Sequence, residues 1–427
     1  MSEQQDKLGV FVAGGPAAGI NGVIKGIVQE ADNAGLHVLG YLNGARGLVH
    51  GECLHLNRRM VEGIHILGGS ILGTSRYRID PEGKDLERII GNLRREGIDG
   101  LVSIGGEGTL QLADHLRCAG IRIVHVPKTI DNDIAGVDQT FGFDTAVHEA
   151  ARMLTSIRLD AEASKTWFIV EIMGRYTGHL ALEAGLASGC TRVLIPEDGP
   201  IDLDDLTSMI ETRARCAHNW GVILVAESAN FGEGFVQHDG RLGGICEQLA
   251  DRLEVACRER DVRSSIRTSN LGYFLRCAEP TGFDRSYAAK LGLGAARLIM
   301  DPAHSGHMVT VQNDQIVPVP MEEVAGKVKP VDRGGIRYQA LCAFAGYESA
   351  RLDLLEQERV LEHAGPALRW LDCHADLETA GKLAMRLGVP TQTLLEVLHE
   401  LVRVETGEAQ ASGATGKVED RQGDCEG

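Results

Sequence analysis

The ten cysteines of this 427-residue chain form no CxxC pair and no Cys/His spacing typical of a metal site. We therefore predict reduced thiols, as in cytosolic proteins, rather than a disulfide framework. The chain also lacks an apolar run of the roughly 20 residues that a membrane-spanning helix needs. Its first residues, Met1 to Lys7, are polar and contain no signal-peptide core. These absences predict a cytoplasmic protein with no membrane partner.

Positive charge is scarce: the chain contains 43 Lys and Arg but 60 Asp and Glu, which gives a net charge of −17. Nucleic-acid binding generally needs a basic surface, so no nucleic-acid partner is expected. A small anionic substrate remains compatible, since a local pocket of Arg and Lys can exist in an acidic protein. Aromatic residues make up only 4%, whereas 53 glycines are present. Abundant glycine suits an α/β protein with many tight turns between strands and helices.

Short apolar runs that end in Gly or Pro alternate with helix-like segments along the first 260 residues. Strands are predicted at residues 9–13, 37–42, 100–104, 121–126, 167–172, 192–195 and 221–226. Helices are predicted at residues 20–34, 86–96, 110–118, 180–187, 206–216 and 246–260. This alternation predicts parallel sheets with helices on both faces, arranged as two α/β lobes with the second starting near residue 145.

The C-terminal part changes character. Amphipathic helical patterns at residues 352–364, 377–387 and 390–402 predict a helical extension over residues 336–404. Residues 405–427 are rich in Gly, Ala, Thr and charge, and they are predicted to be a disordered tail.

The first candidate ligand turn follows the first predicted strand, at Gly14-Gly15-Pro16-Ala17-Ala18-Gly19. A strand, a glycine turn and a helix start together form a phosphate cradle, because backbone N–H groups point outward at a helix N-terminus. The turn is neither the dinucleotide GxGxxG nor a Walker loop, since no Gly-Lys-Ser/Thr follows. A tight turn without a ligand is the alternative.

The second turn, Gly105-Gly106-Glu107-Gly108-Thr109, also follows a predicted strand. Its glycines allow close approach to phosphate. Glu107 is a candidate ligand of Mg²⁺, which prefers a few carboxylates plus phosphate oxygens. Thr109 is expected to cap the next helix and to bond a phosphate. The alternative for Glu107 is a solvated loop acid.

The third turn, Pro127 to Asp133 (PKTIDND), places two carboxylates two residues apart beside a lysine. One carboxylate, Asp131 or Asp133, can take a proton from an attacking hydroxyl, and the other can help to order a metal. Lys128 can neutralise a transferring phosphoryl group. The alternative is an ordinary charged turn.

These three turns, in this order, resemble the phosphofructokinase family, whose members phosphorylate fructose 6-phosphate at its 1-hydroxyl. The resemblance spans residues 8–319 and continues through EIMGRYTGHLALE, VAES and RTSNLGYFLR. It implies two similar three-layer, Rossmann-like lobes: a donor-binding lobe at 1–145 and a sugar-phosphate-binding lobe at 146–335. The chain is expected to cross back to the first lobe near residues 255–310. Dependence on Mg²⁺ and assembly as a homodimer or homotetramer are also implied.

Carried over by position, the resemblance implies that Asp131 is the catalytic base and Asp133 the second acid of its motif. Thr129 would lie near the transferring phosphate, and Arg175 would be a cation that acts with Lys128 in the transition state. The residues implied on the donor side are Gly15, Arg76, Gly106, Glu107, Gly108 and Thr109. The residues implied at the sugar phosphate are Thr129, Asp131, Met173, Gly174, Arg175, Glu227, Arg267, Tyr273 and Arg276. Arg267 and Arg276 would clamp its 6-phosphate through bidentate bonds.

Several positions depart from the common family pattern. Glu107 replaces an Asp, and Tyr273 replaces a His of the ATP-type bacterial enzymes. Thr166, preceded by Lys165, stands where many members place an Arg that reaches a neighbouring subunit. These changes leave the acceptor open.

The phosphoryl donor depends on three positions. By resemblance to the family, Gly108 leaves room for a nucleotide, because pyrophosphate users tend to have an acid at this position. The same resemblance implies that Lys128 and the missing aromatic at Ala45 suit pyrophosphate. The Gly-plus-Lys pairing resembles a branch that often uses ATP, so ATP is the expected donor and pyrophosphate the alternative.

Two other readings remain. Diacylglycerol and NAD kinases share the GG-acid-G-T turn but lack PKTIDND. A non-catalytic sugar-phosphate-binding paralogue would be expected to lose the base, which is present here.

Overall fold

The computed structural model describes residues 7–344, except 78, 80–83, 216–217, 236 and 239–240. Residues 336–344 are helical, whereas the patterns predicted at 352–402 and the tail at 405–427 lie outside the described residues. The two lobes below belong to one compact unit, Met1–Ser208 with Trp220–Gly346. Within the described part, no helix is both long enough and apolar enough to cross a membrane.

The first lobe is built on seven strands: β1 Lys7–Val12, β2 His37–Tyr41, β3 Cys53–Leu56, β4 Ile98–Gly105, β5 Ile123–Pro127, β12 His307–Gln312 and β13 Gln315–Pro320. Their order is β13-β12-β5-β4-β1-β2-β3. The five inner strands are parallel, and β3 and β13 pair antiparallel at the two edges. The prediction of a mainly parallel sheet is thus confirmed.

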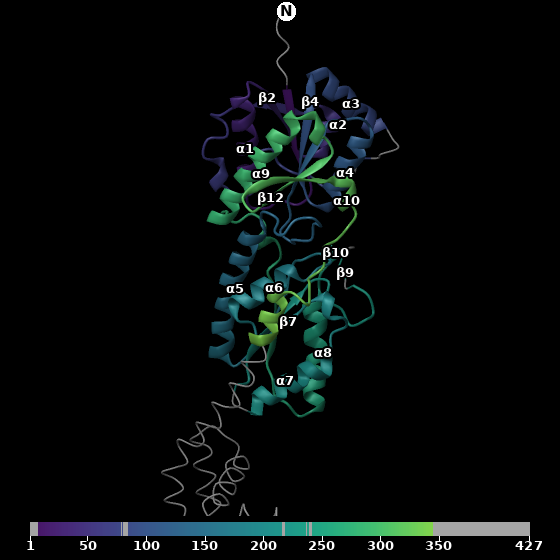
Figure 1. Cartoon of the computed structure of the whole chain (residues 1–427). Helices are drawn as coiled ribbons and strands as arrows, with labels where there is room; N and C mark the ends of the chain where they lie inside the picture. The colour runs from purple at the N-terminus through teal and green to yellow at the C-terminus, as the bar shows by residue number, and fades with distance from the viewer. Residues whose placement is uncertain are drawn as a thin grey trace, which may run out of the picture. The chain divides into compact units, whose positions relative to one another are not determined.

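Alternation along β1 explains the three layers of this lobe. Val10 and Val12 belong to a core cluster with α1 (Ile20–Asn33) and α9 (Gly282–Met300). Phe11 points to the other face, into a cluster with α2 (Ala45–His50), α3 (Lys84–Glu96) and α4 (Glu107–Cys118). Successive strand side chains face opposite sides, so a strand apolar throughout must be covered twice. Figure 1 shows the two helix layers on either side of the sheet.

The second lobe has a fully parallel sheet of four strands: β6 Trp167–Ile172, β7 Arg192–Leu194, β8 Gly221–Ala226 and β11 Ile266–Asn270. The order is β11-β6-β8-β7. The helices α5 (Phe143–Ser164) and α6 (His179–Ser188) pack on one face, and α8 (Ile245–Glu259) contacts β6 and β11. The remaining elements are α7 Leu203–Arg215, α10 Met321–Val324, a hairpin of β9 Gln237–His238 with β10 Arg241–Leu242, and four short 3₁₀ turns. The seven strands and six helices predicted within the first 260 residues are all present, with ends shifted by a few residues.

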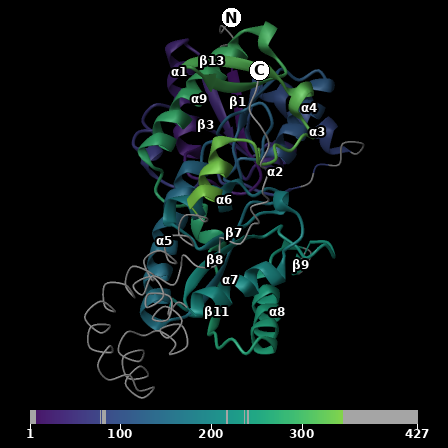
Figure 2. The same cartoon turned by 60° about the horizontal axis from the view of Figure 1, so that its bottom comes forward.

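Several elements carry no clear local signal in the sequence, including β3, α5 and the returning segment α9-β12-β13. After β11 the chain rejoins the first lobe, where β12 pairs with β5 and α9 packs along α1 (Figures 1 and 2). The crossing lies between Asn270, the end of β11, and Gly282, the start of α9, and the returning strands extend to Pro320. Glycines make the close helix crossing possible. A Cβ at Gly292 would lie 2.3 Å from the carbonyl oxygen of Val23.

Gly26→Ala is expected to destabilise the fold by about 1–3 kcal/mol through overpacking of this crossing. Its Cβ would lie 2.6 Å from the carbonyl oxygen of Ala289 and 3.0 Å from the nitrogen of Leu293. Gly91→Ala is the matched control, since it makes the same change in α3, where a Cβ meets nothing within 4 Å. Better helix propensity should stabilise that variant by roughly 0.5–1 kcal/mol. Urea denaturation midpoints compare the two, and equal midpoints would contradict the packing argument.

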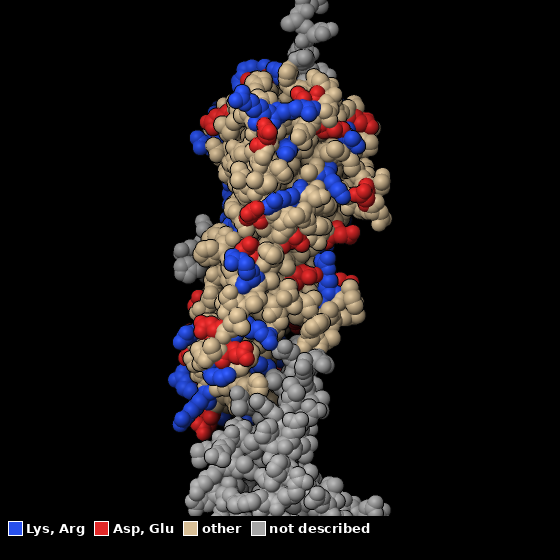
Figure 3. Space-filling view, turned by 90° about the vertical axis from the view of Figure 1, so that its left-hand side faces the viewer, with Lys and Arg blue, Asp and Glu red and all other residues tan. Residues whose placement is uncertain are grey.

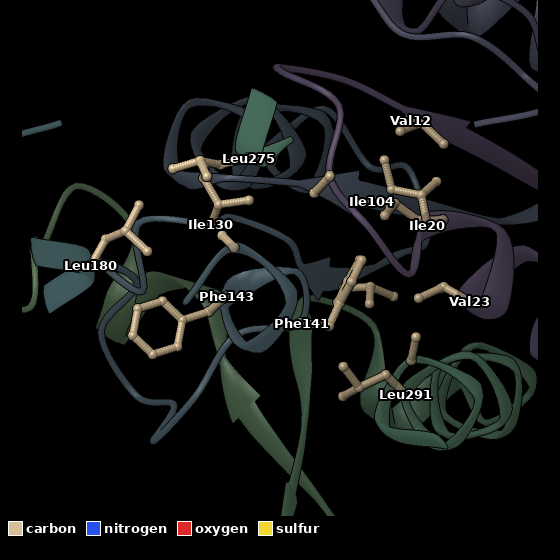
Figure 4. Packing of buried hydrophobic residues seen from close by; sticks show 14 of the residues in the cluster. Val12, Ile20, Val23, Ile104, Ile130, Phe141, Phe143, Leu180, Leu275 and Leu291 are labelled. Carbon is tan, nitrogen blue, oxygen red and sulfur yellow. The ribbon is translucent and has the colours of Figure 1, made fainter. Parts of the chain in front are cut away.

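One apolar cluster joins the two lobes. It runs from Val12 and Ile104 in the first sheet through Ile130, which follows β5, to Leu180 of α6 (Figure 4). Phe141, fully buried, lies in the same cluster beside α1 and α9. The loop that contains the two acids of PKTIDND is therefore anchored in the core on which both lobes pack.

Candidate active site

The three candidate turns meet because their strands end at the same level of the sheet. Val12 of β1 pairs with Ile104 of β4, and Gly105 of β4 pairs with Pro127 of β5. The residues that follow each strand therefore project from one edge, where open parallel sheets bind ligands.

Lys128 sits at the centre of this edge. Its side chain is buried, and its Nζ donates a hydrogen bond to the carbonyl oxygen of Gly15. Gly14 has φ 87°, and a Cβ there would lie 3.4 Å from the Lys128 ammonium. Glycine thus both permits the left-handed turn and leaves room for the cation. Burial lowers the pKa of Lys128 to about 8, with Arg276 and Arg76 lowering it further and Asp131 and Asp133 opposing them.

The second turn differs from expectation in one respect. The helix α4 begins at Glu107 with Gly106 as its N-cap, so Thr109 is the third helical residue and the prediction that it caps the helix is wrong. Thr109 instead packs against Gly105, where a Cβ would lie 2.2 Å from its Oγ1. Glu107 lies in the first turn, where the helix dipole favours an acid, rather than in a solvated loop. Around Gly108, a Cβ would meet nothing within 4 Å.

Within the third turn, Thr129 orients Asp131. The Thr129 hydroxyl donates to Oδ2 of Asp131 over 3.3 Å and accepts from the Asp131 backbone N–H over 3.1 Å. Burial raises the pKa of Asp131, and the carboxylates of Asp133 and Glu227 raise it further, against Arg276 and Arg175. A carboxyl group whose pKa is moved toward neutrality suits a general base.

Glu107 and Asp133 are the acids available to a divalent cation. Asp133 is buried, and its Oδ1 has no hydrogen-bond partner among the described residues. Burial raises the pKa of Asp133, and the charge of Glu107 adds to that effect. Both bonds of Glu107, from the Gly326 N–H and from Gln111, use Oε1, which leaves Oε2 accessible among the described contacts. A small cation with oxygen ligands would relieve this repulsion, so the residues present fit Mg²⁺.

The second lobe contributes the turns after β6 and β8, whose last residues Ile172 and Ala226 pair. Glu227 accepts backbone hydrogen bonds from Gly174 (3.3 Å) and Arg175 (2.8 Å) through Oε1. Arg175 has φ 56°, a left-handed conformation that non-glycine residues rarely adopt. The Glu227 carboxylate therefore holds the turn that aims Arg175.

These turns from both lobes line one cavity of about 520 Å³. The predicted site residues that line it are Gly15, Arg76, Gly106, Glu107, Gly108, Thr109, Lys128, Thr129, Asp131, Met173, Arg175, Glu227, Tyr273 and Arg276. Asp133 and Gly174 are not among the residues that line the described cavities, although each is close in sequence to a lining residue, Asp131 and Arg175. Arg267 is exposed on β11 and lines no described cavity of this chain.

Arg276 is placed between the donor and acceptor sides. A Cβ at Gly15 would lie 3.7 Å from its guanidinium carbon, and the guanidinium stacks 4.7 Å from the ring centre of Tyr273. Arg276 therefore reaches the cavity without Arg267, and the expected pair is not formed within one chain.

Other cavity residues are not among those predicted. Tyr77 follows Arg76 directly and lines the same cavity, and the prediction of Arg76 as a site residue could have indicated it. An adjoining cavity of about 510 Å³ shares Met173, Glu227, Leu242 and Tyr273 with the first. It adds Glu171, which accepts a 2.9 Å bond from Asn270. Such acids and amides are suited to bind sugar hydroxyls.

Anion binding at this site depends on the cavity rather than on the outer surface. On the face shown in Figure 3, basic and acidic side chains are interspersed over the described residues. The cations gathered in the cavity, in contrast, are Arg76, Lys128, Arg175 and Arg276. A low-dielectric, concave site strengthens their attraction for phosphate.

Comparison with known proteins identifies the family. A family model described as phosphofructokinase matches residues 7–299. ATP-dependent 6-phosphofructokinase 2 of Streptomyces coelicolor is 37% identical over 340 residues, covering 77% of this chain and 97% of the relative. Pyrophosphate–fructose 6-phosphate 1-phosphotransferase of Amycolatopsis methanolica is 38% identical over 335 residues, covering 76% and 96%.

A solved structure supports the same fold. The crystal structure of a pyrophosphate-dependent phosphofructokinase from Marinobacter aquaeolei superposes with a TM-score of 0.67 at 21% identity, covering 80% of this chain and 91% of that chain. The family model matches most of the chain, and this chain aligns with nearly the full length of its relatives. Both findings agree with the three turns described above, and the chain belongs to the phosphofructokinase family.

Proposed function

We propose that this protein is a 6-phosphofructokinase that transfers a phosphoryl group from ATP to the 1-hydroxyl of fructose 6-phosphate, giving fructose 1,6-bisphosphate. The observation that carries the proposal is the position of Asp131. Its carboxylate opens onto a cavity lined on one side by three phosphate-type turns and on the other by polar turns of the second lobe. One cavity can therefore hold donor and acceptor together beside a base.

In this mechanism Asp131 takes the proton of the sugar hydroxyl as it attacks, and Thr129 keeps the accepting oxygen oriented. Lys128 and Arg175 stabilise the charge that spreads over the transferring phosphoryl oxygens, as preorganised cations do in a water-poor site. Arg276 binds phosphate near the junction of the two lobes. Glu107 and Asp133 would hold Mg²⁺, which neutralises donor phosphate charge when bound.

The proposed donor is ATP. A Cβ at Gly108 would meet nothing within 4 Å, which leaves room for a nucleotide, and Tyr77 provides an aromatic ring in the lining of the same cavity, which Ala45 does not. Stacking of a base on an aromatic ring is worth about 1–3 kcal/mol. Relatives of nearly equal similarity are named for ATP and for pyrophosphate, so the proposal of ATP rests on Gly108 and Tyr77.

Tyr77→Ala is expected to raise KM for ATP about 5- to 50-fold, because it removes a stacking face. KM for fructose 6-phosphate and any activity with pyrophosphate should stay within about threefold, since neither involves an adenine. Tyr77→Phe is the matched control, because it keeps the ring and loses only the hydroxyl that donates to Asp85. Equal KM values for ATP in the alanine and phenylalanine variants would show that Tyr77 does not stack on the base.

Steady-state phosphorylation of fructose 6-phosphate with Mg²⁺, comparing ATP with pyrophosphate, tests the proposed function. A preference for ATP is expected. A preference for pyrophosphate would make Lys128 and Ala45 decisive over Gly108. Absence of turnover with either donor, together with sugar-phosphate binding, would indicate a non-catalytic paralogue.

The proposal includes the finer expectations for the molecule. The lobe at 1–145, with the returning segment α9-β12-β13, binds the donor, and the rest of 146–335 binds the sugar phosphate. The protein works in the cytoplasm as a homodimer or homotetramer. The cysteines described in the structure are free thiols, which is compatible with that compartment.

A further inference from the structure

Residues 326–331, which follow β13 and α10, run past the second and third candidate turns. The N–H of Gly326 donates to Oε1 of Glu107 over 3.1 Å. Val328 then pairs with Ile134 in an isolated bridge, and the N–H of Lys329 donates to the Asp133 carbonyl over 2.9 Å. This short segment therefore contacts two of the three candidate turns.

The same segment is fixed to the second lobe. The N–H of Val331 donates to Oε1 of Glu197 over 2.9 Å, and Glu197 also accepts from the N–H of Gly178, the N-cap of α6. The carbonyl oxygen of Lys329 lies 3.0 Å from Nε2 of His179. A carbonyl can only accept, so the histidine ring donates this bond. Backbone bonds on both sides thus hold residue 329 in place.

The side chain of Lys329 turns into the loop that contains Asp131. Its Nζ donates to Oδ1 of Asn132 (3.1 Å) and to the carbonyl oxygens of Val137 (2.9 Å) and Asp138 (3.1 Å). Three donors on one ammonium meet three acceptors, which satisfies it fully. Burial lowers the pKa of Lys329 to about 8, and Arg337 lowers it further, against Asp138 and Asp133.

The loop needs such a support at Asn132. This residue, between the two acids, has φ 54°, a strained left-handed conformation for a residue with a side chain. Its Oδ1 also accepts from the N–H of Thr140 over 3.0 Å, which closes the loop on itself. The loop holds its acids in one geometry only while this closure persists.

We infer that Lys329 is a positioning residue for catalysis: its ammonium ties the ends of the 132–138 loop together and so fixes Asp131 and Asp133 in the productive geometry. Lys329 does not line either described cavity, so it acts through the loop. The kinetic part of this inference rests on the proposed function, whereas the ordering of the loop does not.

Lys329→Met in the full chain tests the inference, because methionine keeps the length and removes the charge and all three donors. The expected result is a kcat lowered about 10- to 100-fold, as for a misplaced catalytic group, with KM for both substrates within about threefold. Backbone amides of residues 129–140 should exchange hydrogen about tenfold faster, since local opening becomes easier. Lys327→Met is the control, because Lys327 is an exposed lysine of the same segment.

The two readouts together decide the outcome. Slower turnover with faster exchange in 129–140, both relative to Lys327→Met, supports the inference. Slower turnover with unchanged exchange, or unchanged turnover, overturns it. If the parent protein does not phosphorylate fructose 6-phosphate, the proposed function fails, and exchange alone still supports or overturns the ordering role. Should Lys329→Met not fold, Lys329→Gln is judged by the same criteria.

Discussion

Asp131→Asn is expected to lower kcat about 100- to 10,000-fold while leaving KM for both substrates nearly unchanged. Asparagine has the same shape and can still accept from the Thr129 hydroxyl and present its backbone N–H to Thr129 Oγ1. It cannot take a proton. Steady-state kinetics with saturating Mg²⁺ measure the effect, and a loss below tenfold would show that another group is the base.

The pH dependence gives an independent check on Asp131. An ordinary aspartate has a pKa of about 3.9, and burial with the nearby charges of Asp133 and Glu227 raises the pKa here, against Arg276 and Arg175. The active form is the deprotonated one, so kcat should fall as pH drops through this raised pKa. The acid limb should thus appear at higher pH than for an ordinary carboxylate. It should disappear from the residual activity of Asp131→Asn, and persistence of the same limb would assign it to another group.

Lys128→Met is expected to produce the second large effect, a loss of about 100- to 1,000-fold in kcat, typical of removing one preorganised charge at a transition state. The ammonium is buried beside Gly15 and Asp131, where no water can replace its charge efficiently. Methionine fills a similar volume. Loss of the ammonium also leaves the Gly15 carbonyl without this hydrogen bond and Asp131 without a nearby counter-charge, so the melting temperature should fall.

Donor comparison sharpens the Lys128 prediction. Pyrophosphate lacks the nucleoside with which ATP can make further contacts, so its use should fall further than the use of ATP in Lys128→Met. Lys327→Met again provides the same chemical change at an exposed site and should retain parental kinetics. Equal losses of activity with both donors would show that the Lys128 charge matters for catalysis but does not select the donor.

The amino-acid sequence by itself determined the fold class and most of the candidate site. Gly14-Gly15, Gly105-Gly106 and PKTIDND each follow an apolar strand directly, and the carboxyl ends of neighbouring parallel strands must emerge at one edge. Local sequence therefore places Lys128, Glu107 and Asp131 together without any knowledge of long-range contacts. Local sequence did not predict every detail of these turns: the helix was expected to begin after Thr109, but α4 begins at Glu107.

Long-range contacts decided the rest. The return of α9 and β12 to the first lobe depends on glycines in two helices more than 250 residues apart, which no local window can relate. Arg267 and Arg276 lie on one short motif, yet only Arg276 reaches the cavity, because the strand β11 ends between them and the chain turns. Lys329 lies nearly 200 residues from Asn132, and neither position suggests the other. Residues brought together by chain return carry no periodic or motif signal, and only the packed tertiary structure shows which of them share a site.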